Sequence, residues 1–366
     1  MMKLKYKPDW EKTKENYIAW WAHEDFGRCA INIKAPKDGI SYEEPPRLPE
    51  KLEDRWLDLD YLKELNEYRM GRAFYGGEAV PVWNAGYPGW DTISAFLGCD
   101  VELMEETGWV NTIIDKGEIV DYNYNDITLS QDNRWWVFAK ELHRFAVDQA
   151  KGKAIPGIQA ISGCGDILAS LRGSENLLMD CTDYPEYVRK FDQHLMRIWM
   201  NTFDILYQIT KDGAEGSTNF MHLWAPGKFY IPHCDFAYMI SPKMFREIFL
   251  PSIQMQVEYL DYSLYHVDGI GNFPHVDALC EIPRLQAIQI LPGDGKPSAL
   301  YYMNILKKVQ CAGKNLQIYV KADEVEAALE NLSSLGLLLI VTDCQSEDQA
   351  RYIIRTTEKY SKIRKI

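Results

Sequence analysis

The sequence predicts an α/β protein built as a single (β/α)8 barrel, with a helical extension at the N-terminus and a small antiparallel β insertion. About eight short apolar segments alternate with helical patterns over 366 residues, a length typical of this barrel with insertions. No linker, internal repeat or low-complexity block interrupts the chain, so we expect one domain over residues 1–366. A doubly wound open sheet is the main rival, because it uses the same alternation.

In the first third of the chain, the predicted helices and strands alternate less regularly than in the rest. Residues 1–27 predict the helical extension, because several aromatic residues form an apolar stripe there. Apolar segments at 29–36 and 79–83 predict strands, and 58–75 between them predicts a helix. At 107–130 the alternation of Thr, Ile, Val and Tyr predicts the antiparallel ribbon.

From residue 133 onward the alternation of helices and strands is regular. Helices are predicted at 133–151, 185–210, 241–260 and 346–362, and strands at 154–161, 218–223, 263–268, 285–291, 316–320 and 337–341. Ser241 and Pro242 form a favourable cap and first-turn pair for the third of these helices. Because a barrel gathers its active-site residues at the carboxyl ends of its strands, the candidate functional residues are those directly after each strand.

Composition excludes several classes of function. The chain carries 40 Lys and Arg against 53 Asp and Glu, a net charge of −13, and an acidic surface repels nucleic-acid phosphates. No apolar stretch reaches the ~20 residues that span a bilayer, and the N-terminus lacks the apolar core of a signal peptide. Eight scattered cysteines without a Cys-x-x-Cys motif are interpreted as reduced thiols. We therefore expect a cytoplasmic protein without nucleic-acid or membrane partners.

The strongest local signal is the pair His266-x-Asp268 at the end of a predicted strand. Residues i and i+2 of a strand project from the same face, and imidazole and carboxylate serve both as zinc ligands and as an acid–base pair. Alternatively, Asp268 orients His266 or caps the next turn. Cys344 follows the last predicted strand. Because strand ends converge at one mouth, the three side chains form a candidate zinc site with an open coordination position.

Two further carboxylates are candidates for acid–base catalysis. Asp235 lies in a loop over the predicted mouth, where functional residues concentrate. Asp166 follows a Gly-x-Gly segment, and it is equally well explained as the N-cap of the next helix.

Several other side chains near strand ends are candidates for substrate binding. Gln289 lies on a strand that ends at the same mouth. An aromatic set is a candidate wall for an apolar pocket that takes a flat or methyl-bearing ligand, although core packing explains any one member equally well. The set consists of Trp83, Tyr87, Trp90 and Trp224.

Four segments of the sequence resemble the uroporphyrinogen decarboxylase superfamily. They are Met-Ile-Ser-Pro-Lys-Met-Phe-Arg-Glu-Ile-Phe-Leu-Pro251 followed by Glu-Tyr-Leu-Asp-Tyr-Ser-Leu-Tyr-His266-Val-Asp268-Gly269, then Gly165-Asp-Ile-Leu-Ala-Ser-Leu-Arg-Gly173, and the closing Thr342-Asp-Cys344. The resemblance covers roughly residues 75–360. It implies a (β/α)8 barrel and either a porphyrin decarboxylase or a corrinoid or cobamide methyltransferase.

The resemblance is closer to the methyltransferases. Porphyrin decarboxylases grip the substrate carboxylates with two arginines of an Arg-Gln-Ala-Gly-Arg segment, and Trp83-Asn-Ala-Gly-Tyr87 lacks both. The methyltransferases hold zinc with His-x-Cys on one strand and Cys on the last, which this chain resembles at His266 and Cys344. Asp268 stands where the second ligand is usually Cys, and an oxygen ligand leaves zinc a stronger Lewis acid.

These observations lead to one main hypothesis and two alternatives. The main hypothesis is a zinc-dependent, methyltransferase-like enzyme that transfers a methyl group between a small substrate and a corrinoid protein or a thiol. His266, Asp268 and Cys344 would hold the zinc, and the corrinoid would come with a partner protein. The first alternative is a metal-independent decarboxylase or lyase in which Asp166 or His266 transfers a proton. The second is a ligand-binding barrel without catalysis.

Overall fold

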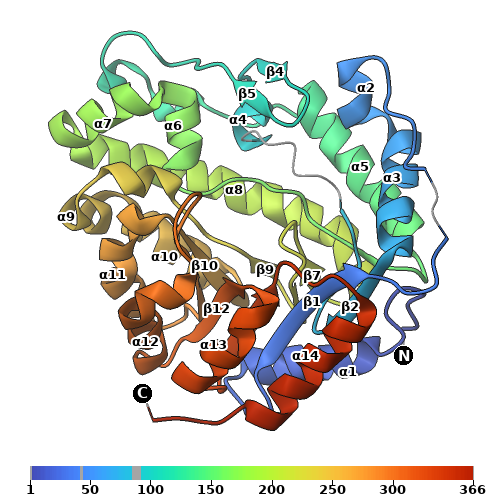
Figure 1. The fold of residues 1–366 in the computed structure, drawn as a ribbon. Coiled ribbons are helices and arrows are strands. Elements are labelled where there is room, and N and C mark those ends of the chain that lie inside the picture. Colours follow the sequence, from blue (N-terminus) through green and yellow to red (C-terminus); the bar gives the residue numbers. More distant parts are fainter. Residues whose placement is uncertain (1, 42–43, 85–91, 366) are drawn as a thin grey trace.

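The computed structural model describes residues 2–41, 44–84 and 92–365, in which helices surround one strongly curved sheet (Figure 1). Seven strands of this sheet are hydrogen-bonded in the order β2-β1-β13-β12-β11-β10-β9. All neighbours are parallel except β2, which runs antiparallel to β1. The strands are β1 (Ala30–Pro36), β2 (Ala73–Gly77), β9 (Phe229–Tyr230), β10 (Tyr262–Asp268), β11 (Ala287–Leu291), β12 (Asn315–Val320) and β13 (Leu337–Val341).

The strands outside this sheet form short pairs. β3 (Val82–Trp83) runs parallel to β6 (Ile155–Pro156), and β7 (Ser217–Thr218) runs antiparallel to β8 (Trp224–Ala225). Between β7 and β9 a side chain replaces the backbone ladder: Ser217 Oγ donates to the Phe229 carbonyl (3.0 Å) and accepts from its amide (3.3 Å). The predicted α/β class is therefore confirmed and the fold is TIM-like, but the strands of the described residues do not form a closed hydrogen-bonded barrel.

Helices cover the outer face of the sheet (Figure 1). They are α1 (Trp10–Trp21), α2 (Leu52–Leu57), α3 (Leu59–Gly71), α4 (Thr92–Phe96), α5 (Arg134–Ala150), α6 (Asp166–Arg172), α7 (Ser174–Asp183), α8 (Pro185–Ala214), α9 (Pro242–Met244), α10 (Leu250–Tyr259), α11 (Val276–Cys280), α12 (Met303–Cys311), α13 (Val325–Asn331) and α14 (Glu347–Tyr360). The predicted cap is present, because Ser241 Oγ accepts from the Met244 amide (3.3 Å). Within the described residues, no helix combines the length and the apolar character that crossing a membrane requires.

Short helical turns fill several of the connections. Six are 3-10 turns, and η4 is a single π turn between α9 and α10. The seven turns are η1 (Ile119–Asp121), η2 (Tyr124–Asp126), η3 (Asp235–Met239), η4 (Phe245–Phe249), η5 (Ile270–His275), η6 (Ala299–Tyr302) and η7 (Ala322–Glu324).

The predicted ribbon at 107–130 is wrong in place and extent. The hairpin consists of β4 (Val101–Leu103) and β5 (Gly108–Val110), and the following segment contains only 3-10 turns. Its apolar side chains Ile114 and Ile119 are buried in the main core. The alternation that predicted a ribbon therefore reflects anchoring to the core, not pairing with a second strand. The sequence interpretation also missed β2, at the end of the predicted helix 58–75, and β9, within a predicted loop.

Helix α1 seals the barrel-like sheet at the amino ends of its strands. Trp10, Trp20 and Trp21 of α1 are buried against small and aliphatic residues that begin the parallel strands, namely Ala30, Leu264, Ala287 and Leu338. The Trp21 indole donates to the Trp224 carbonyl (2.9 Å), and the Trp224 ring lies 5.5 Å from that of Trp10. Trp224, which the sequence predicts as a pocket wall, belongs to this apolar cluster. We call the cluster at the amino ends of the strands the apolar plug.

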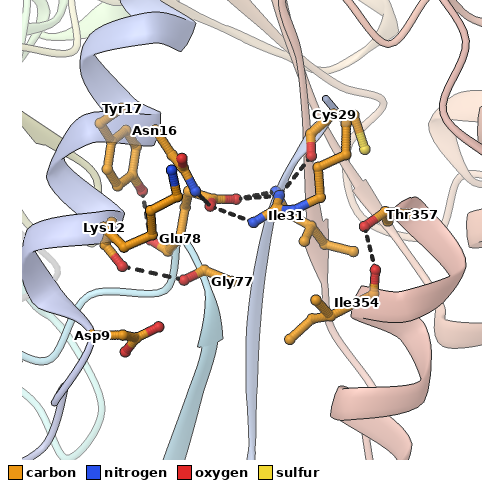
Figure 2. Close-up of polar contacts among 12 residues, drawn as sticks. Asp9, Lys12, Asn16, Tyr17, Cys29, Ile31, Gly77, Glu78, Ile354 and Thr357 are labelled. Atoms are coloured by element: carbon orange, nitrogen blue, oxygen red, sulfur yellow. Dashed lines mark hydrogen bonds and ion pairs between the residues drawn. The ribbon is translucent and has the colours of Figure 1, made fainter. Parts of the chain in front are cut away.

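A buried carboxylate, Glu78, connects α1 to the edge of the sheet. It accepts from both terminal nitrogens of Arg28 (2.8 and 2.7 Å), from the Ile31 amide of β1 (2.7 Å) and from Asn16 Nδ2 of α1 (2.7 Å). Figure 2 shows Glu78 between α1 and β1, directed at Ile31 and Asn16. Because a buried charge is tolerated only when paired and hydrogen-bonded, these contacts form one interdependent unit.

Replacing Glu78 is expected to destabilise the fold strongly. Glu78→Gln removes the negative charge and leaves the guanidinium of Arg28 without its counter-charge, which costs about 3–5 kcal/mol in comparable buried pairs. Urea-induced unfolding measures this change. Glu50→Gln is the matched control, because Glu50 pairs with Arg47 at side chains 86% and 87% exposed, and such pairs contribute about 0–1 kcal/mol. Equal losses in the two variants would contradict the argument.

His143 of α5 is buried and positions the segment that follows β6. Its Nδ1 lies 2.6 Å from the Ala139 carbonyl, and its Nε2 accepts from the Gln159 amide (3.2 Å). Because Nε2 must accept, the ring is neutral. Burial lowers the pKa of His143 to about 4.

This lowered pKa predicts a loss of stability in mild acid. The unfolded chain binds a proton at His143 near the ordinary pKa of ~6.5, while the folded chain does so only near 4, so stability falls as the pH decreases between these values. The full effect is roughly 3 kcal/mol. In urea unfolding at pH 7 and at pH 4.5, His143→Gln should lose less stability on acidification than the unmodified chain. Identical pH dependence in both proteins would refute this assignment.

Candidate functional site

Five ionisable side chains meet at the carboxyl ends of neighbouring strands. His266 and Asp268 lie on one face of β10, His233 and Asp235 follow β9, and Asp166 begins α6 after β6. They form two groups of three that share Asp235: Asp166 with His233 and Asp235, and Asp235 with His266 and Asp268. Within each group the potential ligand atoms all lie within 4.8 Å of one another. Strand pairing produces this arrangement, because parallel strands end at the same edge.

Gln289 sets the orientation of the His266 ring. Gln289 is buried on β11, opposite His266 in the strand register. Its Nε2 donates to Gln317 Oε1 (3.0 Å), so its Oε1 accepts from His266 Nδ1. His266 Nε2 therefore carries the lone pair, and it lies 3.8 Å from Asp268 Oδ2. Gln289, which the sequence predicts to bind substrate, lies beneath the imidazole and positions it.

Burial keeps this histidine neutral at pH 7. Desolvation lowers the pKa of His266, although the charge of Asp235 opposes the shift. Desolvation also raises the pKa of Asp268, and the charge of Asp235 adds to that rise. A neutral imidazole with its Nε2 directed at carboxylates is the form that binds a metal.

Two glycines allow the loop after β6 to approach the loop after β9. A Cβ atom on Gly163 would lie 2.3 Å from the His233 carbonyl oxygen. Gly165 has a φ of +74°, and a Cβ there would lie 2.6 Å from Cys234 Sγ. Only glycine fits both positions. The Gly-x-Gly segment noted in the sequence thus brings Asp166 beside Asp235.

Asp166 caps a different helix from the one expected. Its Oδ1 accepts from the Phe236 amide (2.8 Å) and its Oδ2 from the Asp235 amide (3.0 Å), so it caps η3, while Gly165 precedes α6. Burial, reinforced by the charge of Asp235, raises the pKa of Asp166 to about 7. Asp192 of α8 was not predicted, and it holds the loop by accepting from the Gly165 amide (2.7 Å).

Two further predicted site residues, Cys344 and Trp83, do not join these groups. Cys344 lies in neither group; its buried thiol donates to the Ser346 carbonyl (3.4 Å), and burial raises its pKa. Trp83 is buried against Phe145, with ring centroids 5.9 Å apart. Tyr87 and Trp90 lie outside the described residues.

An aromatic cavity exists, but other residues form it. A cavity of about 390 Å³ lies between α3 and α5 and reaches Asn84 and Gln159, which follow β3 and β6. Its aromatic lining comes from Trp56, Tyr61, Phe96, Trp135 and Phe138. These residues are spread over four helices, so sequence spacing gave no signal for the cavity.

Two backbone positions near the mouth are strained. Ser162, in the loop after β6, and His222, in the loop after β7, adopt left-handed φ angles of 56° and 58°. Residues other than glycine adopt this conformation uncommonly, and such positions are concentrated at functional sites. Burial, with the nearby charge of Lys34, lowers the pKa of His222 to about 4. The sequence placed His222 at a strand end but gave no sign of this conformation.

Comparison with known proteins places the chain by its fold. No protein-family model matches the sequence, and a search of curated proteins found no match. Solved structures, however, share its TIM-like α/β architecture. A methyltransferase from Methanosarcina mazei superimposes over 95% of this chain and 98% of its own, with a TM-score of 0.60 and 10% sequence identity. At this low sequence identity, the structural similarity establishes a shared fold alone.

The tautomer of His266 is directly testable. Nitrogen-15 NMR of the labelled chain at pH 7 should show a neutral His266 ring protonated at Nδ1, because Gln289 offers only its oxygen to that atom. His266→Asn identifies the resonance. Gln289→Leu removes the acceptor and should shift the ring towards a mixture of tautomers, whereas Gln208→Leu, a change at an exposed position of α8, should not. A ring protonated at Nε2 in the unmodified chain would contradict the geometry.

Proposed function

We propose that this chain is a zinc-dependent, methyltransferase-like enzyme that transfers a methyl group between a small substrate and a corrinoid protein or a thiol. The observation that carries the proposal is the group Asp235, His266 and Asp268 at the carboxyl ends of β9 and β10. The fold shared with a methyltransferase supports the reaction class. We also propose that the chain is related to the uroporphyrinogen decarboxylase superfamily, as the sequence segments described above suggest.

The donor atoms of this group fit zinc. A neutral imidazole nitrogen and two carboxylate oxygens are ordinary zinc ligands, and three protein ligands leave a position for substrate. Asp235 takes the place that the sequence alone gave to Cys344. Zinc bound there would supply Lewis acidity, which lowers the pKa of a thiol or hydroxyl ligand. Gln289 and Gln317 would hold His266 in its ligating orientation, as the outer hydrogen-bond partners of metal-binding histidines do.

Features outside the ionisable groups are suited to the substrate and a partner. The aromatic cavity beside Asn84 and Gln159 offers an apolar surface for a methyl-bearing molecule. Tyr238 and Met239 of η3 and Tyr301 of η6 are exposed on connections near the site. The Tyr238 ring packs on the backbone of Gly269 and Gly271, where a Cβ would lie 2.9 and 2.6 Å away. These exposed apolar side chains suit a docking corrinoid protein.

A second candidate function is supported by Asp166. With its pKa raised to about 7, this carboxyl group is partly protonated at neutral pH and exchanges its proton readily, as a general acid must. A metal-independent decarboxylase or lyase would use it to protonate a carbanion. Activity that survives strong chelators would favour this function over the first.

Metal analysis of the purified full chain tests the main proposal. We expect at least one equivalent of zinc in the unmodified chain and in Cys344→Ala, and at least a tenfold loss of affinity in His266→Asn and Asp268→Asn, because each loses a ligand. Methyl transfer from methylcobalamin to a thiol, followed by absorbance, should fail in the same two variants. Metal-free protein after loading with zinc would overturn the proposal, and metal loss in Cys344→Ala would restore the thiolate as a ligand.

A further inference from the structure

We propose that the mouth binds two divalent cations and that the second is held by Asp166, His233 and Asp235, with Asp235 shared between the two sites. This inference rests on the proposed function, which supplies the first cation on Asp235, His266 and Asp268. The ligand is a borderline divalent ion such as Zn²⁺ or Co²⁺, because imidazole nitrogen and carboxylate oxygen suit such ions.

The two sites have matching geometry. His233 Nε2 lies 3.7 Å from Asp166 Oδ2, and His266 Nε2 lies 3.8 Å from Asp268 Oδ2. Both gaps are too long for a hydrogen bond. They are close to the separation of about 3.3–3.6 Å expected for two ligands that each lie ~2.0–2.1 Å from one zinc ion. Each pair is therefore spaced to hold an ion between its members.

In both imidazoles, a carbonyl oxygen beside Nδ1 fixes the orientation of the ring. His233 Nδ1 lies 3.1 Å from the Ile231 carbonyl, and His266 Nδ1 donates to Gln289 Oε1. A carbonyl accepts only from N–H, so each Nδ1 carries the proton and each Nε2 carries the lone pair. An outer hydrogen bond that fixes the tautomer accompanies most metal-binding histidines. The two rings lie 6.3 Å apart and nearly perpendicular, at 83°, so they approach Asp235 from different directions.

Asp235 can serve both ions. It belongs to both groups, and a carboxylate has two oxygens with lone pairs for separate ions. Enzymes with two-metal sites hold their ions ~3.5–4 Å apart and commonly act on anionic or ionisable groups. Asp166 remains available as a ligand, because each of its oxygens uses one lone pair for a backbone amide and retains another.

Charge also favours a second cation. Within the described part of the chain, neither Asp166 nor Asp235 nor Asp268 has a lysine or arginine nitrogen within 4.0 Å, and histidines are their only basic neighbours at that distance. When all three carboxylates are ionised, as metal ligands are, their charge exceeds that of one divalent ion by one. A second divalent ion would change the net charge of the site from negative to positive. That positive charge would attract an anionic thiolate or oxyanion substrate.

Metal stoichiometry of the full-length chain tests the inference. Chelator-treated protein is titrated with Zn²⁺ by calorimetry and analysed by mass spectrometry, and with Co²⁺ by absorbance and electron paramagnetic resonance. We expect two equivalents in the unmodified chain and one in His233→Asn, whose amide nitrogen replaces Nδ1 but not Nε2. Asp235→Asn should weaken both sites. The control His194→Asn changes a histidine bound to the Ile127 carbonyl and should keep two equivalents, and circular dichroism checks folding.

The outcomes separate this inference from the proposed function. Two equivalents that fall to one in His233→Asn support it, and magnetic coupling between two Co²⁺ ions supports the shared carboxylate. One equivalent in both the unmodified chain and His233→Asn overturns the second site and leaves the proposed function intact. Zero equivalents overturn both. Two equivalents that persist in His233→Asn place the second ion elsewhere and also overturn the inference.

Discussion

The buried carboxylate of Glu78 is the contact on which the arrangement of the barrel depends. It accepts a hydrogen bond from the β1 backbone at Ile31, just beyond the residues that pair with the edge strand β2, and it connects α1 to this part of the sheet through Asn16. Arg28 neutralises it. Because α1 is held there, its tryptophans fill the amino ends of the strands. One paired charge thus holds the helix that carries the apolar plug against the sheet.

The plug gives the interior two chemically different halves. Below, Ala30, Leu264 and Ala287 pack against aromatic rings. Above, the same strand faces carry His266 and Gln289, two residues further along. Residues two apart share a face, so the change from apolar to polar occurs within a single strand. Desolvation by the surrounding protein then lowers the pKa of His266 and raises that of Asp166, so a neutral imidazole and a readily protonated carboxyl group lie in the same polar half.

The candidate site depends on close backbone approach as much as on its ionisable residues. Gly163 and Gly165 let the loop after β6 lie against the loop after β9, and Asp192 fixes that loop from α8. The carboxylate of Asp166 in turn caps the turn that carries Asp235. Asp192 thus holds the loop that carries Asp166, and Asp166 holds the turn that carries Asp235. These contacts bring Asp166 and Asp235 together without a lysine or arginine nitrogen within 4.0 Å of either carboxylate among the described residues.

The sequence by itself determined the α/β class, most helices, the strands from 263 onward and the pairing of His266 with Asp268, because periodicity and residue spacing are local properties. Only the tertiary structure decided which distant residues lie beside His266 and Asp268. It placed His233 and Asp235 beside that pair through β9, a strand of two residues that is too short to leave a periodic signal. It placed Cys344 in the apolar core and Trp224 in the plug. Those positions depend on how the strands curve and which faces they bury, and neither is encoded within a short window of sequence.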